Sequence, residues 1–307
     1  MALSAPNGPA LGIIRIGTRR SALALTQAEE VCRRLQALDA KVSVELVPMM
    51  TSGDRTLDQP LAEIGGKGLF TKEIEDALLD GRIDLAVHSA KDMQTQLPPG
   101  LALAAVPPRE DARDVLIAAS GAAHIKDLPQ GARLGTSSLR RAAQALHVRP
   151  DLRIVSLRGN VQTRLAKLER GEADAILLAA AGLKRLGISP LPGHPLPLEE
   201  MLPAAAQAAL GLECREGDAR MLSLLAPLND ADAAAAVAAE RSLLAALEGS
   251  CRMPIAAYAQ CMEENLRLRA MLLAPDGAWA RACDVTGKKE EAEALGRRAG
   301  AVLKERG

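Results

Sequence analysis

Aromatic residues are nearly absent from this chain, which has one Phe, one Trp and one Tyr among 307 residues. Surfaces that bind single-stranded nucleic acid stack the bases on aromatic side chains, so this scarcity argues against such a surface. The chain also lacks net charge, because 38 Lys and Arg residues balance 38 Asp and Glu residues. No overall field draws the protein to nucleic acid or to a membrane, and any anion site must therefore be local.

Long apolar runs and cysteine pairs are missing as well. No run approaches the roughly 20 apolar residues that cross a bilayer, and the first residues lack the basic start and apolar core of a secretory signal. The five cysteines are odd in number and form no CxxC pair. This pattern fits a reducing compartment better than a disulfide framework or a zinc site, so we expect a cytoplasmic protein without a metal.

Several well-known catalytic motifs are also absent. The sequence has no HExxH, no G-x-S-x-G elbow and no dinucleotide fingerprint, so metal hydrolysis, serine hydrolysis and hydride transfer have no support. The stretch IGGKGL is not a Walker-type phosphate loop, because Gly68 follows Lys67 and no glycine stands at the required distance upstream. Its glycines predict a mobile cover over a cleft, with Phe70 at its packed end.

Two stretches of the chain follow the same order of elements. Each begins with a short β-rich run, a Gly-Thr turn and an amphipathic helix, and continues with a second helix, a glycine stop and an apolar strand. The first copy spans 12–89 and the second spans 132–182. The repeat predicts two α/β domains of similar topology that face each other across a cleft, unless ordinary βα units resemble each other here by chance.

Proline-bearing stretches mark the crossings between these domains, around Pro107-Pro108 and from Pro190 to Pro203. From about residue 230 the pattern changes to a strong helix, three apolar alternations with a Pro275-Asp276-Gly277 turn, and a final amphipathic helix. The predicted fold class is therefore α/β, with two α/β domains and a small α+β domain at the C-terminal end. The predicted boundaries are 1–107 with 204–226 for domain 1, 108–203 for domain 2, and 227–307 for domain 3.

Positively charged residues occupy matching places in the two repeats. Arg19 and Arg20 stand at the first helix start, and Arg140 and Arg141 stand at the equivalent helix start of the second repeat. Strand C-terminal ends and helix N-termini are where α/β folds bind anions, and arginine pairs with carboxylates at two points. We expect a cleft ligand with several anionic groups; the alternative is that these arginines are solvated. Further candidate cations are Lys67, Lys91, Arg158 and Arg164.

One carboxylate stands among these cations. Asp92 follows a predicted apolar strand directly after Lys91. A carboxylate there repels an anionic ligand unless it has a specific partner, such as an N–H donor or a developing cation. An ion pair with Lys91 or with an arginine is an equally open interpretation. His88, on the same strand, is read as a core residue with satisfied polar atoms.

Only one cysteine combines a loop with small neighbours and an adjacent cation. Cys251 follows the helix that Gly249 ends, and Arg252 comes next. The C-terminal end of a helix disfavours a thiolate, whereas the arginine favours one. The sequence therefore permits an attachment point without indicating a strong nucleophile. Three other cysteines are expected to pack in the interior: Cys32, Cys214 and Cys261.

Ordered blocks along nearly the whole chain resemble one known family, the porphobilinogen deaminases or hydroxymethylbilane synthases. The blocks include IGTRRSALALTQA, ELVPMMTSGD, GGKGLFTKEIEDALLDGRIDLAVHSAKD, PREDARDVLI, LGTSSLRRAAQ, SLRGNVQTRLAKL and LEGSCRMPIAAY. The resemblance implies three domains, of which the first two are similar to the two-lobed periplasmic binding proteins. It also implies a monomer without nucleic acid or membrane partners.

The resemblance implies a transferase that deaminates four porphobilinogen molecules, couples them head to tail and releases hydroxymethylbilane. A dipyrromethane cofactor, bound to Cys251 through a thioether, would act as the primer. Because each pyrrole carries acetate and propionate, the growing chain accumulates carboxylates, which would explain the cationic cleft. Asp92 matches the catalytic aspartate, which accepts from pyrrole N–H groups and stabilises developing positive charge.

The remaining site residues also follow from the resemblance. Positions that hold the cofactor match Ser21, Lys91, Ser137, Arg140, Arg141 and Arg158. Positions that hold the substrate match Arg19, Lys67, Ser89, Arg164 and Gln207. A non-catalytic two-lobed receptor for a polyanionic small molecule is the alternative function, but it leaves Cys251 without a role.

The chain departs from the family pattern at a few places. Ala206-Gln207-Ala208 replaces the usual Gly-Gln-Gly, and Ser250 and Arg252 replace a usual glycine and glutamine. The stretch SAKDMQ replaces a usual Ser-Met-Lys-Asp-Val-Pro. If either glycine of the crossing needs a positive φ, alanine strains the backbone there. The charged set is intact, so we expect activity, at a reduced rate if the crossing is strained.

Overall fold

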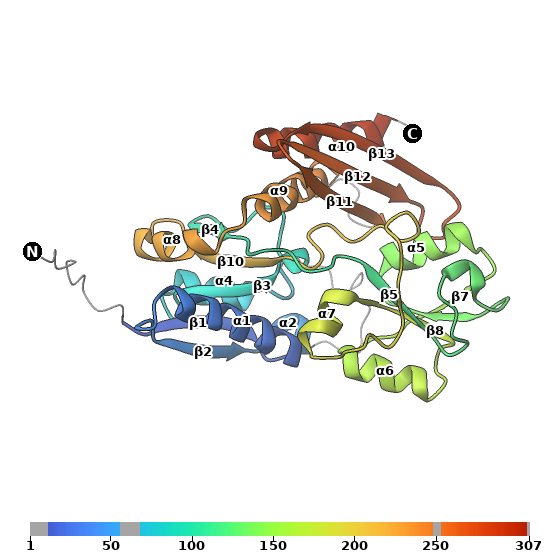
Figure 1. Cartoon of the computed structure of the whole chain (residues 1–307), viewed down its shortest axis with the longest axis horizontal. Helices are drawn as coiled ribbons and strands as arrows, with labels where there is room; N and C mark the ends of the chain where they lie inside the picture. Colours follow the sequence, from blue (N-terminus) through green and yellow to red (C-terminus); the bar gives the residue numbers. More distant parts are fainter. Residues whose placement is uncertain (1–11, 56–67, 248–252, 306–307) are drawn as a thin grey trace, which may run out of the picture.

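The computed structural model describes residues 12–55, 68–247 and 253–305. The strands of these residues form two five-stranded sheets and one three-stranded sheet. In Figure 1 the first five-stranded sheet lies at the left, the second lies at the right, and the three-stranded sheet lies above them. Helices pack on each sheet, so the predicted fold class, two α/β units with a small α+β unit, is confirmed.

The first sheet has the strand order β2-β1-β3-β10-β4, in which β1 pairs in parallel with β2 and β3, and β10 runs antiparallel between β3 and β4. Ala28, Val31 and Leu35 recur at helical spacing on one face of α1 and are fully buried against this sheet. The strands of this sheet and the helices around it are β1 (Ile14–Arg19), α1 (Ala22–Leu38), β2 (Val44–Met49), α2 (Ser52–Arg55), α4 (Lys72–Leu79), β3 (Leu85–Ser89), the 3-10 turn η1 (Ala90–Asp92), β4 (Leu101–Ala105), β10 (Leu210–Arg215), α8 (Ala219–Leu225) and η3 (Ala226–Leu228).

The second sheet has the order β7-β6-β8-β5-β9, with β6 parallel to β7 and β8, and β5 antiparallel to β8 and β9. Fully buried Leu116, Leu134 and Leu177 form part of its core. The strands of this sheet and the helices around it are β5 (Asp114–Ala118), η2 (Ile125–Asp127), β6 (Arg133–Gly135), α5 (Leu139–Val148), β7 (Arg153–Val155), α6 (Val161–Glu169), β8 (Ala175–Ala179), α7 (Ala180–Arg185) and β9 (His194–Pro195).

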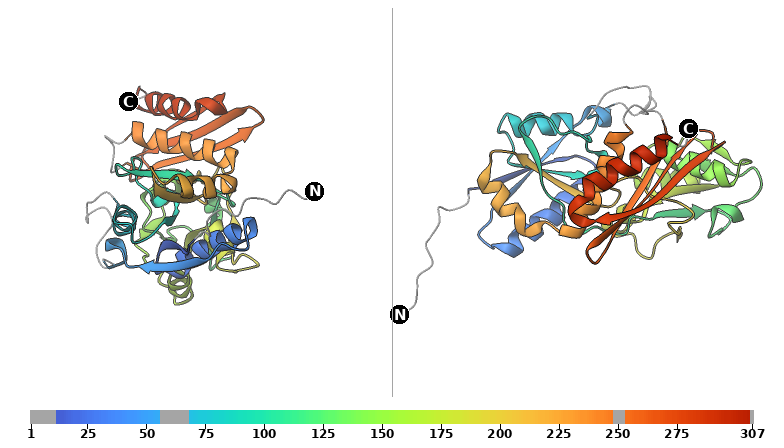
Figure 2. Two further views of the ribbon diagram at one scale, coloured as in Figure 1. Left: turned by 90° about the vertical axis from the view of Figure 1, so that its left-hand side faces the viewer. Right: turned by 90° about the horizontal axis from the view of Figure 1, so that it is seen from above.

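The third sheet is an antiparallel meander covered by two helices. Strands β11 (Ile255–Met262), β12 (Asn265–Leu273) and β13 (Ala280–Lys288) pair in order, and the predicted turn between β12 and β13 contains Gly277 with φ +73°. Helices α9 (Ala231–Ala246) and α10 (Ala292–Glu305) pack on the sheet and on each other, and a short turn η5 (Lys289–Glu291) precedes α10. Figure 2 shows α10 lying across the strands.

Two segments connect the five-stranded sheets, 106–113 and 196–209. The second contains Ala206 with φ +58° and Ala208 with φ +74°. Both values fall in the left-handed region, which costs an alanine roughly 1–2 kcal/mol relative to its ordinary conformations. The strain expected from alanine in place of the usual glycines is therefore present at both positions.

A single buried carboxylate fastens both connecting segments to α9. Glu240 is fully buried and accepts from Arg109 Nη1 at 2.7 Å, Arg109 Nη2 at 3.0 Å and the backbone amides of Ala206 and Ala259 at 2.5 and 2.6 Å. Arg109 Nε donates to the carbonyl of Gln207 at 2.9 Å. Because every charge in this group is paired, the crossing has a defined path between the sheets.

Candidate active site

Asp92 lies where two neighbouring strands end. Strand β1 ends at Arg19 and β3 ends at Ser89, and the turn η1 that follows β3 carries Lys91 and Asp92. Because β1 and β3 pair in parallel, their C-terminal ends meet at one edge of the sheet. This edge is where open α/β sheets bind their ligands.

Arg19 lies between two carboxylates. Its Nη1 is 3.9 Å from Asp92 Oδ2, which is too long for a hydrogen bond. Its other edge binds Asp54, with Nη2 at 2.5 Å from Oδ1 and Nε at 3.3 Å from Oδ2, and its Cζ lies 4.2 Å from the centroid of the Phe70 ring. Asp92 thus has an arginine within ion-pair range while 32% of its side chain stays exposed to solvent.

The three predicted serines make different contacts. Ser21 is the N-cap of α1, and its hydroxyl accepts from an amide of the first turn at 3.3 Å. Ser89 Oγ is 2.9 Å from Gln27 Nε2, so its position at the end of β3 is fixed by α1. Ser137 is exposed before α5, with its Oγ 3.2 Å from Ser156 Oγ.

Arg140 and Arg141 are buried, with 6% exposure each. Both donate to Asp114, Arg140 from Nη2 at 2.7 Å and Arg141 from Nη2 at 2.7 Å and Nε at 3.2 Å. Their Nη1 atoms donate to the carbonyls of Leu202 at 2.6 Å and Leu177 at 2.9 Å. The interpretation that these arginines are solvated is wrong, because the fold supplies a buried carboxylate partner.

Gln207 completes this buried group. Its Nε2 donates to Asp114 Oδ1 at 2.9 Å and to the carbonyl of Ala112 at 2.7 Å. Burial by itself raises the pKa of Asp114, but Arg140 and Arg141 outweigh this effect and hold the pKa far below its usual range. Arg140 Nε has no hydrogen-bond partner among the residues described.

Two further candidate cations, Lys91 and Arg164, have lowered pKa values. Desolvation by nearby protein atoms lowers the pKa of the Lys91 amine; Asp92 opposes this effect and Arg141 adds to it. Arg164 Nε donates to the carbonyl of Gly159 at 2.8 Å. Burial, together with repulsion from Arg141 and Arg158, lowers the pKa of Arg164 to about 10. Like charge from the neighbouring arginines therefore opposes the charged form of Arg164.

Two predicted site residues, Lys67 and Cys251, lie outside the described residues, as do Gly249, Ser250 and Arg252. The prediction of a mobile cover falls mostly on the same undescribed part. Phe70, at its end, packs beneath Arg19.

The predictions that His88 and three of the cysteines are packing residues are confirmed. His88 is 5% exposed, and its Nε2 is 2.9 Å from the buried Glu213 carboxylate. Cys214 is fully buried, and Cys32 and Cys261 pack against hydrophobic cores. Burial raises the pKa of all three thiols, so these cysteines are structural.

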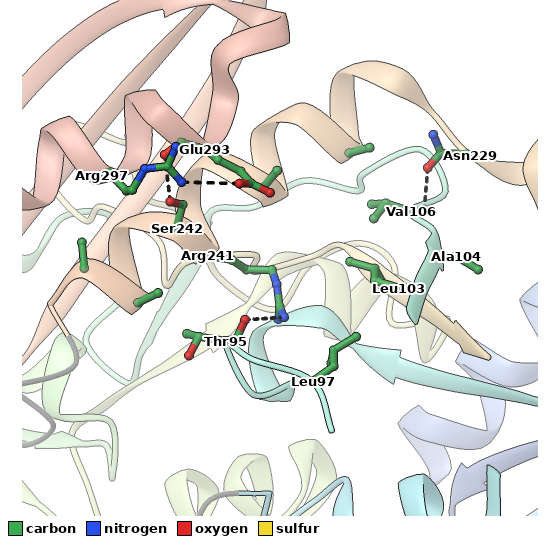
Figure 3. Close-up of a pocket in the computed structure, with 14 residues that line it drawn as sticks. Thr95, Leu97, Leu103, Ala104, Val106, Asn229, Arg241, Ser242, Glu293 and Arg297 are labelled. Atoms are coloured by element: carbon green, nitrogen blue, oxygen red, sulfur yellow. Dashed lines mark hydrogen bonds and ion pairs between the residues drawn. The ribbon is translucent and has the colours of Figure 1, made fainter. Parts of the chain in front are cut away.

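A large pocket of about 920 Å³, whose lining does not include Asp92, lies between β4 and helices α9 and α10 (Figure 3). Arg241 reaches from α9 into it and donates from Nη2 to the carbonyls of Gln94 at 2.6 Å and Thr95 at 3.1 Å. These carbonyls belong to the segment that directly follows Asp92. Arg241 thus links that segment to the helix that precedes Cys251 in the sequence.

Sequence reasoning did not single out Asp54 or Asp114. Both belong to quoted blocks, ELVPMMTSGD and PREDARDVLI. Their partners, Arg19 for Asp54 and Arg140 with Arg141 for Asp114, are separated from them by more than 20 residues. No local spacing reveals such pairs; only the excess of arginines at helix starts indicates that balancing carboxylates must exist.

Among residues 12–55, 68–247 and 253–305, no group of three or more His, Cys, Asp and Glu side chains is placed to hold a metal ion. Within the same residues, no helix has the length and apolar character needed to span a membrane.

Comparison with known proteins gives two family matches. Residues 14–223 match the model of the porphobilinogen deaminase dipyromethane cofactor binding domain, and residues 234–305 match that of the porphobilinogen deaminase C-terminal domain. A search of solved structures finds, among others, the effector binding domain of BenM with benzoate, at 19% identity and a TM-score of 0.43 over 70% of this chain and 90% of that one.

Curated relatives match over almost the whole length. The porphobilinogen deaminase of Syntrophotalea carbinolica is 54% identical over 294 residues, which cover 96% of this chain and 93% of the relative. The enzyme of the same name from Paracoccus denitrificans is 53% identical over 285 residues, which cover 92% of this chain and 91% of the relative. These matches show that the chain belongs to the porphobilinogen deaminase family.

Proposed function

We propose that Asp92 is the catalytic carboxylate of this chain and that Cys251 carries its cofactor. As a member of the family, the chain is a transferase that deaminates and couples porphobilinogen on a dipyrromethane cofactor. The observation that carries the proposal is the position of Asp92 at the joint end of β1 and β3, where Arg19 Nη1 approaches Asp92 Oδ2 to 3.9 Å without a hydrogen bond. A carboxylate so placed would face a ligand bound at this edge of the sheet, with a cation beside it.

The residues present fit an anionic cofactor. Burial, and after it repulsion from Arg141 and Arg158, lowers the pKa of Arg164. Carboxylates on the pyrrole rings would bring negative charge to these guanidinium groups. Buried Arg140 Nε, which has no partner among the described atoms, offers a further donor to such a group. Lys91, Ser21 and Ser137 complete the proposed cofactor contacts.

Substrate would enter the same cleft and be held by Arg19, Lys67, Ser89 and Arg164, with Gln207 at the crossing. When bound, the dipyrromethane supplies the pyrrole carbon at which coupling begins. Asp92 would accept hydrogen bonds from pyrrole N–H groups and stabilise the positive charge that develops as ammonia leaves the substrate. The guanidinium groups orient the acidic side chains and thereby place each ring relative to Asp92.

The domain boundaries, the oligomeric state and the location of the protein are part of the proposal. We infer domain 1 at 1–107 and 204–226, domain 2 at 108–203 and domain 3 at 227–307. The insertion of β10 between β3 and β4 supports the discontinuous first domain. A monomer without a nucleic acid partner follows from the family resemblance and the balanced charge, and the odd cysteine count supports the cytoplasm.

Steady-state turnover of porphobilinogen by Asp92→Asn tests the catalytic role. Losing an electrostatic stabiliser of this kind lowers kcat by about 100-fold or more, while the mass of the bound cofactor should be unchanged. Asp84→Asn serves as the control, because Asp84 forms a similar arginine pair with Arg15 in the same sheet. A near-normal rate for Asp92→Asn would remove Asp92 from its role.

A further inference from the structure

Asp54 holds the edge of the Arg19 guanidinium that faces away from Asp92. Nε and Nη2 of Arg19 lie 3.3 and 2.5 Å from the two oxygens of Asp54. Nη1, on the other side of the group, is the nitrogen that lies 3.9 Å from Asp92. Two parallel contacts to one carboxylate fix the plane of a guanidinium as well as its position.

Asp54 is itself held rigidly. Thr51, which is fully buried, donates to Asp54 Oδ2 from its hydroxyl at 2.8 Å. The short helix α2 is tied down by the amide of Gly53, which donates to the carbonyl of Leu69 at 2.7 Å. Burial raises the pKa of Asp54, but Arg19 and Thr51 outweigh it and lower the pKa overall, so Asp54 is ionised at neutral pH.

The face of the guanidinium is fixed as well. Arg19 Cζ lies 4.2 Å from the centroid of the Phe70 ring, a cation–π distance. That ring fits only because residue 53 is glycine, since a Cβ there would lie 2.3 Å from a ring carbon. Arg19 is therefore constrained along one edge and one face, and its Nη1 edge remains directed toward Asp92.

We propose that Asp54 is a positioning residue, which keeps Arg19 from closing onto Asp92 and presents Nη1 to a substrate carboxylate. The inference rests on the roles proposed above for Arg19 and Asp92. The separation of 3.9 Å is short enough that a small rotation of Arg19 would form a direct ion pair with Asp92. Such a pair would occupy both the anion binder and the catalytic carboxylate, so Asp54 protects both by competing for the guanidinium.

The test is a double-mutant cycle in turnover of porphobilinogen by the cofactor-loaded enzyme. Asp54→Asn should lower kcat/KM by roughly 10- to 100-fold, with a raised KM and a lowered kcat, because a misplaced group costs about that much. In an Arg19→Gln background there is no guanidinium to position. The same Asp54→Asn change should then cost less than about twofold, which a merely structural role would not produce.

A matched control lies on the same strand. Arg15 donates from Nε and Nη2 to Asp84 at 3.0 and 2.9 Å, the same two-point arrangement outside the proposed site. Asp84→Asn should leave kcat/KM within about twofold. If Asp54→Asn does not fold, Thr51→Val removes one support of Asp54 and should give a smaller loss in the same direction, again absent in the Arg19→Gln background.

Equal losses from Asp54→Asn with and without Arg19 would overturn the inference, as would near-normal kinetics of Asp54→Asn. Those results would leave the proposed function intact, because Asp92→Asn tests it separately. A loss of kcat/KM from Asp54→Asn in the wild-type background supports the inference if the same change costs less than about twofold in the Arg19→Gln background.

Discussion

Replacement of Asp114 by asparagine is the sharpest test of how the cationic residues are held. The substitution keeps the size of the side chain but removes its charge and one acceptor oxygen. Asp114 is fully buried, and it accepts three hydrogen bonds of 2.7–3.2 Å from Arg140 and Arg141 and one of 2.9 Å from Gln207. The variant therefore leaves two buried guanidinium groups without their counter-charge.

The magnitude follows from the cost of breaking a buried pair. Removing one partner of such a pair costs about 3–5 kcal/mol, because the other charge stays buried. With an m-value of about 3 kcal/mol/M, the urea midpoint should fall by about 1 M or more. Asp174→Asn is the matched control: its pair with Arg133 is 2.7 Å long but about 40% exposed on both sides, so its loss should cost less than about 1 kcal/mol.

The difference between wild type and Asp114→Asn should also depend on pH. The pKa of Asp114 is lower in the folded state than in the unfolded state, where it is about 3.9. Its contribution to stability is therefore complete above about pH 5 and is lost as pH falls below that unfolded value. A gap under about 1 kcal/mol at pH 7, or one that does not narrow on acidification toward pH 3, would refute the reasoning.

Two further changes test the crossing and the cleft. Ala206→Gly and Ala208→Gly relieve roughly 1–2 kcal/mol of left-handed strain each, but they lose about 0.8 kcal/mol of methyl burial and 0.4–1 kcal/mol through the unfolded chain. Each should shift the unfolding free energy by less than about 1 kcal/mol in urea titrations, and a loss above 2 kcal/mol would contradict the account. Arg164→Gln should raise the thermal midpoint and raise KM for porphobilinogen. Folding lowers the pKa of Arg164 to about 10, so its charged form destabilises the folded state at all pH values below that value. A lower midpoint with unchanged KM would contradict this prediction.

Much of the fold was predictable because it follows from short-range patterns. The apolar residues of α1 recur at a local helical spacing that survives folding. The turn predicted at Gly17-Thr18 is wrong, because both residues pair with β2 inside β1, whereas Gly135 does end β6. The positive φ of Ala206 was predicted as a condition, from alanine standing where glycine is usual. The order of strands, with β10 inserted between β3 and β4, depends on pairing over more than 100 residues, which no window of sequence contains.

The site divides in the same way. Arg19 and Asp92 were predicted from their places at strand ends and lie together at one sheet edge. Arg140 and Arg141 were expected at a helix start, and they are there, but their burial on Asp114 was not expected. A charged side chain at a helix start can face solvent, ligand or a carboxylate from another strand. Only the tertiary structure distinguishes these cases.

The attachment of the cofactor is the central claim, and mass spectrometry tests it most directly. Protein from cells that make tetrapyrroles should exceed its sequence mass by two pyrrole units, and the excess should map to the peptide that contains Cys251. Cys251→Ser should have the mass of its sequence. Cys261→Ser should keep the adduct, because the Cys261 thiol of the wild type donates to the carbonyl of Asp232. An unmodified wild-type protein, or an adduct that remains in Cys251→Ser, would contradict the account.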